Sequence, residues 1–208
     1  MKLYSSIFLF FFLTFNYGQE SSQKQVNTSY EEILKAIGEK ERDTLIKQVF
    51  KRYQCSEYLS GNIEFYYKND QLRLIKHSYK QNSDHNLEYY YLENDTLRLY
   101  TTFTEILRSN THYAQSERAT SFSMEKVLDV TENRMFLSQK DVLICMERKD
   151  MQKQSEWDND YFSTLNFKKA DCTTDMVDIQ YRYRILRKAE KKLLKYGGKP
   201  PGCIFYLW

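Results

Sequence analysis

The middle of the chain alternates apolar and polar residues with a period of two, and it does so twice. The stretch EFYYKNDQLRL, beginning at Glu64, returns as EYYYLENDTLRL, beginning at Glu88. Each copy is an alternating run, the polar pair Asn-Asp and a second alternating run, which is the pattern of two strands joined by a tight turn. Asn and Asp tolerate the left-handed backbone that such turns require. The duplication therefore predicts two neighbouring β-hairpins.

The alternation also predicts a register. A two-residue turn at Asn69-Asp70 places apolar residues opposite each other, and we expect a three-residue turn to absorb the one extra residue before Asn94. The pairs expected from these turns are Tyr67 with Leu72, Phe65 with Leu74, Tyr91 with Leu99, and Tyr89 with Thr101. A third, degenerate copy is expected in NRMFLSQKDVLICME, where 134–137 and 142–146 flank a polar turn.

On both sides of this region, apolar residues recur at the spacing of a helix. Ser29 and Glu32 form a capping-box pattern ahead of one apolar stripe, and a second stripe ends at Gly197-Gly198, where Pro200-Pro201 prevents its continuation. The predicted fold is α+β, an antiparallel β-meander of six or more strands with N-terminal and C-terminal helices. The expected layout is a signal peptide at 1–18 and a single domain at 19–208, with a helix at 29–54, a sheet at 60–150, a helix at 175–196 and an apolar tail at 202–208.

The first residues predict export. Lys2 is followed by an apolar run from Leu3 to Phe15 and a small residue at Gly18, the pattern of a secretory signal. The run is shorter than the ~20 residues of a membrane-spanning helix. We expect cleavage near Gly18, a secreted or periplasmic protein, and no membrane span afterwards.

Four cysteines follow this segment, and an even number is typical of disulfides in an oxidising compartment. Three pairings are open, and buried free thiols are the alternative. The four residues are Cys55, Cys145, Cys172 and Cys203.

Composition and motifs limit the chemistry. A net charge of +3 does not argue for a dedicated polyanion binder, and we do not expect nucleic acid as a partner. The sequence contains no HExxH pattern, G-x-S-x-G elbow or phosphate-binding glycine loop. We expect His77 on the outward face of a strand and His85 in a loop. The sequence therefore predicts no catalytic residue, metal site or cofactor, and it favours a protein that is not an enzyme.

Two surfaces are candidates for binding. If the paired residues above face the helices, an aromatic row lines the opposite, outward face of the sheet, and tyrosines suit recognition because they offer area and a hydroxyl at little entropic cost. That row is Tyr66, Ile75, Tyr90 and Tyr100. The second candidate is a basic helix face that could meet an acidic partner, formed by Arg184, Arg187, Lys188, Lys191 and Lys195.

The three repeat segments quoted above resemble uncharacterised secreted bacterial proteins with a tyrosine-rich antiparallel β-meander. The resemblance implies the fold and no activity. The expected function is that of an exported macromolecule-binding module that uses the outward tyrosine face on an unknown protein or an envelope polymer. The alternatives are a cell-envelope polymer hydrolase and an immunity-type inhibitor of a secreted toxin.

Overall fold

A computed structural model describes residues 23–38, 46–81, 84–116, 119–195 and 203–204. The chain divides into two units, 1–45 and 46–208. The predicted signal peptide lies outside the described residues, as does most of the predicted apolar tail. Within the described segments, every helix is too short or too polar to cross a bilayer.

The first unit contributes a helix at 23–38, whose buried stripe is Val26, Tyr30 and Ile33. The prediction of a helix at 29–54 is wrong in its second half, because Ile46–Gln54 forms strand β1. Val49, Phe50 and Tyr53 are β-branched or aromatic, and such residues favour a strand once a neighbouring strand is available for pairing.

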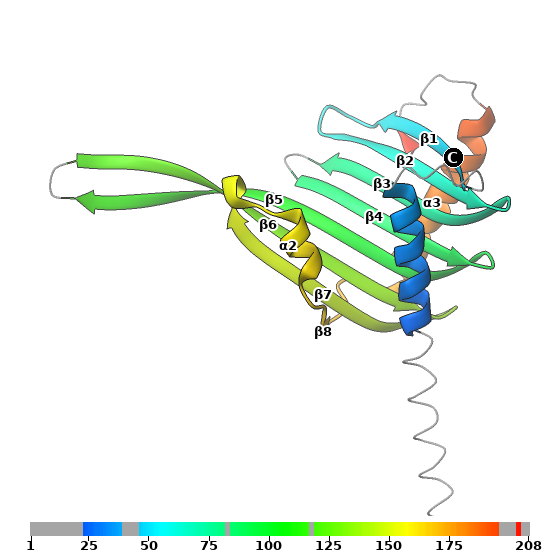
Figure 1. Ribbon diagram of the computed structural model, residues 1–208. Helices are drawn as coiled ribbons and strands as arrows, with labels where there is room; N and C mark the ends of the chain where they lie inside the picture. The colour runs from blue at the N-terminus through cyan, green and yellow to red at the C-terminus, as the bar shows by residue number, and fades with distance from the viewer. Residues whose placement is uncertain (1–22, 39–45, 82–83, 117–118, 196–202, 205–208) are drawn as a thin grey trace, which may run out of the picture. The chain divides into compact units, whose positions relative to one another are not determined.

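The second unit contains one antiparallel sheet whose eight strands follow in chain order, a meander (Figure 1). The predicted α+β class and antiparallel meander are confirmed. The strands are β1 (Ile46–Gln54), β2 (Leu59–Lys68), β3 (Gln71–Gln81), β4 (Asp84–Glu93), β5 (Thr96–Ser116), β6 (Ala119–Leu137), β7 (Val142–Lys153) and β8 (Lys168–Ala170). The 3-10 helix η1 (Gln154–Glu156) and the helix α2 (Asn159–Thr164) separate β7 from β8, and α3 (Met176–Lys195) follows β8.

The two Asn-Asp pairs make the turns that the sequence predicts. Asn69, Asp70, Asn94 and Asp95 all have positive φ angles of 49° to 58°, the left-handed backbone of a two-residue hairpin turn. The three-residue turn expected in the second copy is wrong, since Glu93 pairs directly with Thr96.

A bulge then shifts the register in both hairpins. Tyr67 pairs with Leu72 as predicted, but the shift leaves Arg73 unpaired, so that Phe65 lies opposite Ile75 rather than Leu74. The second hairpin has its shift at the corresponding place, between Tyr91 and Leu92, and the third has one between Phe136 and Leu137. The pairs Tyr91–Leu99 and Tyr89–Thr101 are confirmed, and so is a hairpin in the third copy.

The extra residue of the second copy therefore moves the glutamate. Counted back from each turn, Glu88 takes the place of Ile63 rather than that of Glu64. Because neighbouring residues of a strand point to opposite faces, Glu64 and Glu88 lie on opposite sides of the sheet.

Helix α3 covers one face of the sheet, referred to below as the α3 face. Its residues Ile179, Ile185, Leu186 and Ala189 are buried, and they belong to one hydrophobic cluster with the strand residues beneath them. That strand set includes Ile63, Phe65, Ile75, Tyr90, Tyr100, Met135 and Cys145. Helix α2 lies against the opposite face, where Phe162 packs edge-on against Phe103 with ring centroids 5.7 Å apart (Figure 1).

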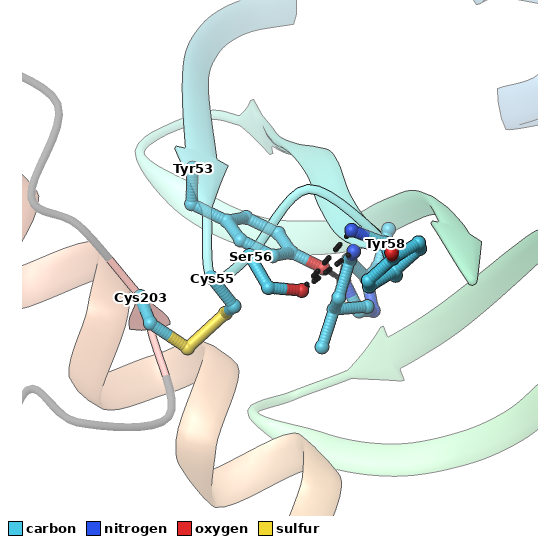
Figure 2. The surroundings of a disulfide bond; sticks show 7 residues. Tyr53, Cys55, Ser56, Tyr58 and Cys203 are labelled. Carbon is cyan, nitrogen blue, oxygen red and sulfur yellow. Dashed lines mark hydrogen bonds between the residues drawn. A yellow bond between two sulfur atoms is a disulfide. The ribbon is translucent and has the colours of Figure 1, made fainter. Parts of the chain in front are cut away.

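Two disulfides connect segments of this unit that are distant in sequence. Cys145 of β7 bonds to Cys172, just after β8, and Cys55 at the end of β1 bonds to Cys203 (Figure 2). Beside Cys55, the hydroxyl of Ser56 accepts hydrogen bonds from the backbone N–H groups of Tyr58 and Leu59, at 3.1 Å each, which fixes the β1–β2 turn. Disulfides of this kind fit a secreted or extracellular protein.

Candidate functional site

A buried histidine and a buried glutamate face each other across two strands on the α3 face. His77 of β3 and Glu88 of β4 are direct cross-strand partners, and they are 4% and 3% exposed. The His77 Nδ1 lies 3.2 Å from a carboxylate oxygen of Glu88, and the His77 Nε2 lies 2.8 Å from the hydroxyl of Tyr53. His77 donates from Nδ1 to Glu88, and its Nε2 shares a second hydrogen bond with the Tyr53 hydroxyl, which links β1, β3 and β4.

Glu88 is the centre of a larger hydrogen-bond network, called here the Glu88 network. Besides His77, three tyrosine hydroxyls and one guanidinium N–H donate to its two oxygens. The donors are Tyr90 at 2.8 Å, Tyr79 and Tyr100 at 3.2 Å each, and Arg182 of α3 at 2.6 Å. The carboxylate is therefore saturated with donors, and it connects α3 to the sheet by a charge-assisted bond.

The network fixes the protonation of its members. Burial raises the pKa of Glu88, but the hydrogen bond and charge of His77, and then the charge of Arg182, outweigh burial and lower the pKa to about 2. Burial and the charge of Glu88 raise the pKa of Tyr79 to about 12. At neutral pH the carboxylate is therefore ionised and the Tyr79 hydroxyl keeps its proton, which suits the donor and acceptor roles above.

A pocket of about 340 Å³ opens beside this network, between α3 and the ends of β2 to β4. Its floor is His77, Glu88 and Tyr90. The rest of the lining is apolar or lies at the mouth, and consists of Leu59, Tyr79, Gln81, Asp178, Tyr181, Arg182, Ile185, Leu186 and Ile204. Ile204 is fully buried and follows Cys203, so the Cys55–Cys203 disulfide holds one wall of the pocket. We call this the α3 pocket.

An open groove of about 740 Å³ crosses five strands of the second unit. Two cross-strand rows of side chains on the face opposite α3 contribute to it. The first row is Arg52, Asn62, Ser78, Leu87 and Phe103, and the second is Gln54, Ser60, Lys80, His85 and Glu105. We call this the sheet groove.

An Arg-Glu-Arg cluster lies next to the sheet groove, on the same face. Glu132 accepts from Arg134 and Arg148, with nitrogen–oxygen distances of 2.6 to 2.8 Å. The guanidinium of Arg134 lies 4.3 Å from the ring centre of Phe167, and that of Arg148 lies 4.9 Å from Phe162. These contacts attach α2 and the chain beyond it to the sheet, which is a structural role.

The predicted tyrosine surface is not where the alternation placed it. Ile75, Tyr90 and Tyr100 lie beneath α3, whereas Tyr66 lies on the opposite face, and each of the four is at most 5% exposed. The prediction that these four residues share one outward face is therefore wrong. The reason is the bulge at Arg73, because a one-residue shift reverses the face of every residue beyond it.

The predicted basic helix face is found in part. Arg184, Lys188 and Lys191 are exposed on α3, and Arg187 is half-buried, 3.2 Å from Glu190. The side chain of Lys195 is outside the described residues. Binding by this face stays a prediction.

The comparisons with known proteins give no family. No protein-family model, curated protein or solved structure matches the chain.

The sequence does not predict the Glu88 network. His77, predicted on the outward face of its strand, is buried on the α3 face, and His85, predicted in a loop, lies in β4. The available signal was the one extra residue before Asn94, which moves Glu88 to the face of His77.

Among the described residues, no cluster of three or more His, Cys, Asp or Glu side chains could hold a metal ion.

Proposed function

We propose that this protein is an exported binding module that holds an extended segment of a partner polypeptide in the sheet groove. The observation that carries the proposal is the groove itself, which crosses five strands. Its lining combines polar side chains with the aromatic or apolar residues Tyr53, Tyr79, Leu87 and Phe103. Four inter-strand spacings of about 4.8 Å give a length of roughly 19 Å, enough for about six residues of extended chain.

Charge favours an acidic segment. Arg52 and Lys80 line the groove and are exposed, and Glu105 is the one carboxylate among the lining residues. A partner segment with one or two acidic residues would complement this excess of positive charge, which favours specificity and the rate of encounter.

A polypeptide partner is also supported by the projecting end of β5 and β6. The two strands pair with each other as far as Ser116 and Ala119, whereas the pairing of β4 with β5 ends at Glu105 and that of β7 with β6 ends at Val127. Among the described strands, none pairs with the outer edges of this two-stranded arm (Figure 1). Such edges offer backbone N–H and C=O groups to another polypeptide strand.

A hydrolase is supported less well. The pair of His77 and Glu88 has the residue types of a general acid or base, but the lone pairs of Glu88 are taken by five protein donors. An immunity-type inhibitor of a secreted toxin would be one form of the proposed binder.

Selection from a random-peptide display library on the purified mature protein tests the proposal. We expect enrichment of peptides with acidic residues, and at least tenfold weaker binding of these peptides to Ser78→Trp, which fills the groove floor. Lys80→Glu should weaken the binding of the same peptides, because it removes charge complementarity at an exposed position. The matched control is Val177→Trp, because Val177 is 70% exposed on α3. Peptides that bind both tryptophan variants as well as the wild type, or a selection without enrichment, would reject the sheet groove as the binding site.

A further inference from the structure

The α3 pocket has the features of a small-ligand site. Its volume of about 340 Å³ lies within the range of ligand cavities, and it combines apolar walls with a few converging polar groups. The apolar walls come from three parts of the chain, with Leu59 from β2, Ile185 and Leu186 from α3, and Ile204 from the segment held by Cys203. At about 30 Å³ per water-sized group, the space holds roughly eleven non-hydrogen atoms.

The polar groups of the α3 pocket differ in what they can still bind. Glu88 already accepts from five donors, and the two ring nitrogens of His77 are engaged by Glu88 and Tyr53. Arg182 donates one N–H to Glu88, but a guanidinium has five donors, and the Arg182 side chain is 46% exposed. It therefore keeps donors within reach of a ligand, and the fork of a guanidinium matches a carboxylate.

We propose that the α3 pocket binds a small organic carboxylate with an aromatic or short aliphatic body. The carboxylate meets Arg182 at the mouth, and the body lies among Leu59, Ile185 and Ile204. Tyr181, which is 56% exposed, adds an aromatic surface at the mouth. Tyr79 lines both cavities, but their other lining residues differ, and the carboxylate site does not depend on the peptide-binding proposal.

Asp178 gives the proposal a sharp test. It lines the same pocket, one helical turn before Arg182, and its negative charge opposes an incoming carboxylate. It is exposed and does not donate to or accept from Glu88, so Asp178→Asn leaves the Glu88 network unchanged. We expect this substitution to bind carboxylates several-fold more tightly than the wild type.

An NMR titration of the mature protein with 3-phenylpropanoate and its neutral amide tests the site. We expect saturable binding of the acid, with a dissociation constant on the order of 1 mM, and at least tenfold weaker binding of the amide. Arg182→Gln should weaken the binding of the acid at least tenfold. Arg184→Gln, two residues away on the same helix, should leave the binding of the acid unchanged.

Asp178→Asn keeps the test decisive if Arg182→Gln fails to fold. Equal binding of acid and amide overturns the proposal. It is equally overturned if Asp178→Asn binds no more tightly than the wild type, or if the acid shows no saturation at concentrations well above the expected constant.

Discussion

Replacing Glu88 by glutamine is the most direct test of the network beneath α3. Glutamine has nearly the same shape, but it carries no charge and brings an NH₂ group among groups that are themselves donors. Glutamine keeps one of the two acceptor oxygens, so its NH₂ group would face the donors of the other oxygen, which are either His77 and Tyr90 or Tyr79, Tyr100 and Arg182. Unmatched buried donors and a half-buried unpaired guanidinium are both destabilising.

The size of the effect follows from the pKa of Glu88. The folded protein holds that pKa near 2, against an ordinary value of 4.5. A difference of about 2.5 pKa units corresponds to roughly 3 kcal/mol of folding free energy at pH 7. We therefore expect Glu88→Gln to lower the free energy of unfolding by about that amount at pH 7, a decrease of roughly 1.5 M in the urea midpoint if the slope is about 2 kcal/mol per molar.

The pH dependence identifies the cause. Because the pKa is lowered on folding, the unfolded chain binds the proton more readily between pH 4.5 and 2, so the stabilisation is present above pH 4.5 and is lost as the pH falls through this range. At pH 3 the difference between wild type and Glu88→Gln should shrink to roughly 1 kcal/mol. The assay is urea unfolding, followed by circular dichroism, at a series of pH values from 7 to 3.

The duplicated motif supplies a matched control. Glu64 heads the first copy as Glu88 heads the second, but it lies on the opposite face, where its side chain contacts Gln48, Lys76 and Tyr66. Lys76 is 30% exposed, and we expect Glu64→Gln to change the stability by about 1 kcal/mol or less. A loss for Glu88→Gln that is the same at pH 3 as at pH 7 would refute the electrostatic reasoning, because it would point to shape rather than charge.

Three further predictions concern turns, close contacts and disulfides. A Cβ on Gly61 would lie 2.6 Å from both a backbone oxygen and a tyrosine hydroxyl, so Gly61→Ala should lower the unfolding free energy by about 1–3 kcal/mol, whereas Gly38→Ala, which meets nothing within 4 Å, should not lower it. Asp95→Gly should raise the melting temperature, equivalent to about 0.5–1 kcal/mol, because Asp95 has φ of 57°; an unchanged melting temperature would contradict this. Replacing Cys145 and Cys172 together by serine should lower the unfolding free energy in urea by about 3–4 kcal/mol, since their disulfide spans 27 residues; a midpoint equal to that of the wild type would contradict this.

The hairpins could be predicted because their signals are local. Asn-Asp between two alternating runs identifies a two-residue turn from residues that are neighbours in sequence, and the structure has such turns at Asn69 and Asn94. Residues 46–54 could not be assigned in the same way. Their apolar spacing is compatible with a helix, but they form a strand because they pair with β2.

The candidate sites could not be predicted, because each depends on a backbone detail or on distant segments. The bulges decide which residues lie beneath α3, and the sequence of the repeat does not predict these bulges. The disulfide partners of Cys55 and Cys145 are 148 and 27 residues away, and three pairings were open. The α3 pocket needs Arg182 and Ile204 to be brought over β3 and β4.

The sequence by itself determined a repeated strand-turn-strand pattern, four cysteines able to form disulfides, and an antiparallel meander, since these depend on neighbouring residues and their alternation. The tertiary structure alone decided which face each side chain takes. Because strand residues alternate with a period of two, a shift of a single position exchanges the two faces of a strand. That shift placed His77 on the same face as Glu88 and buried Tyr90 and Tyr100 beneath α3, which left the opposite face of the sheet to form the groove.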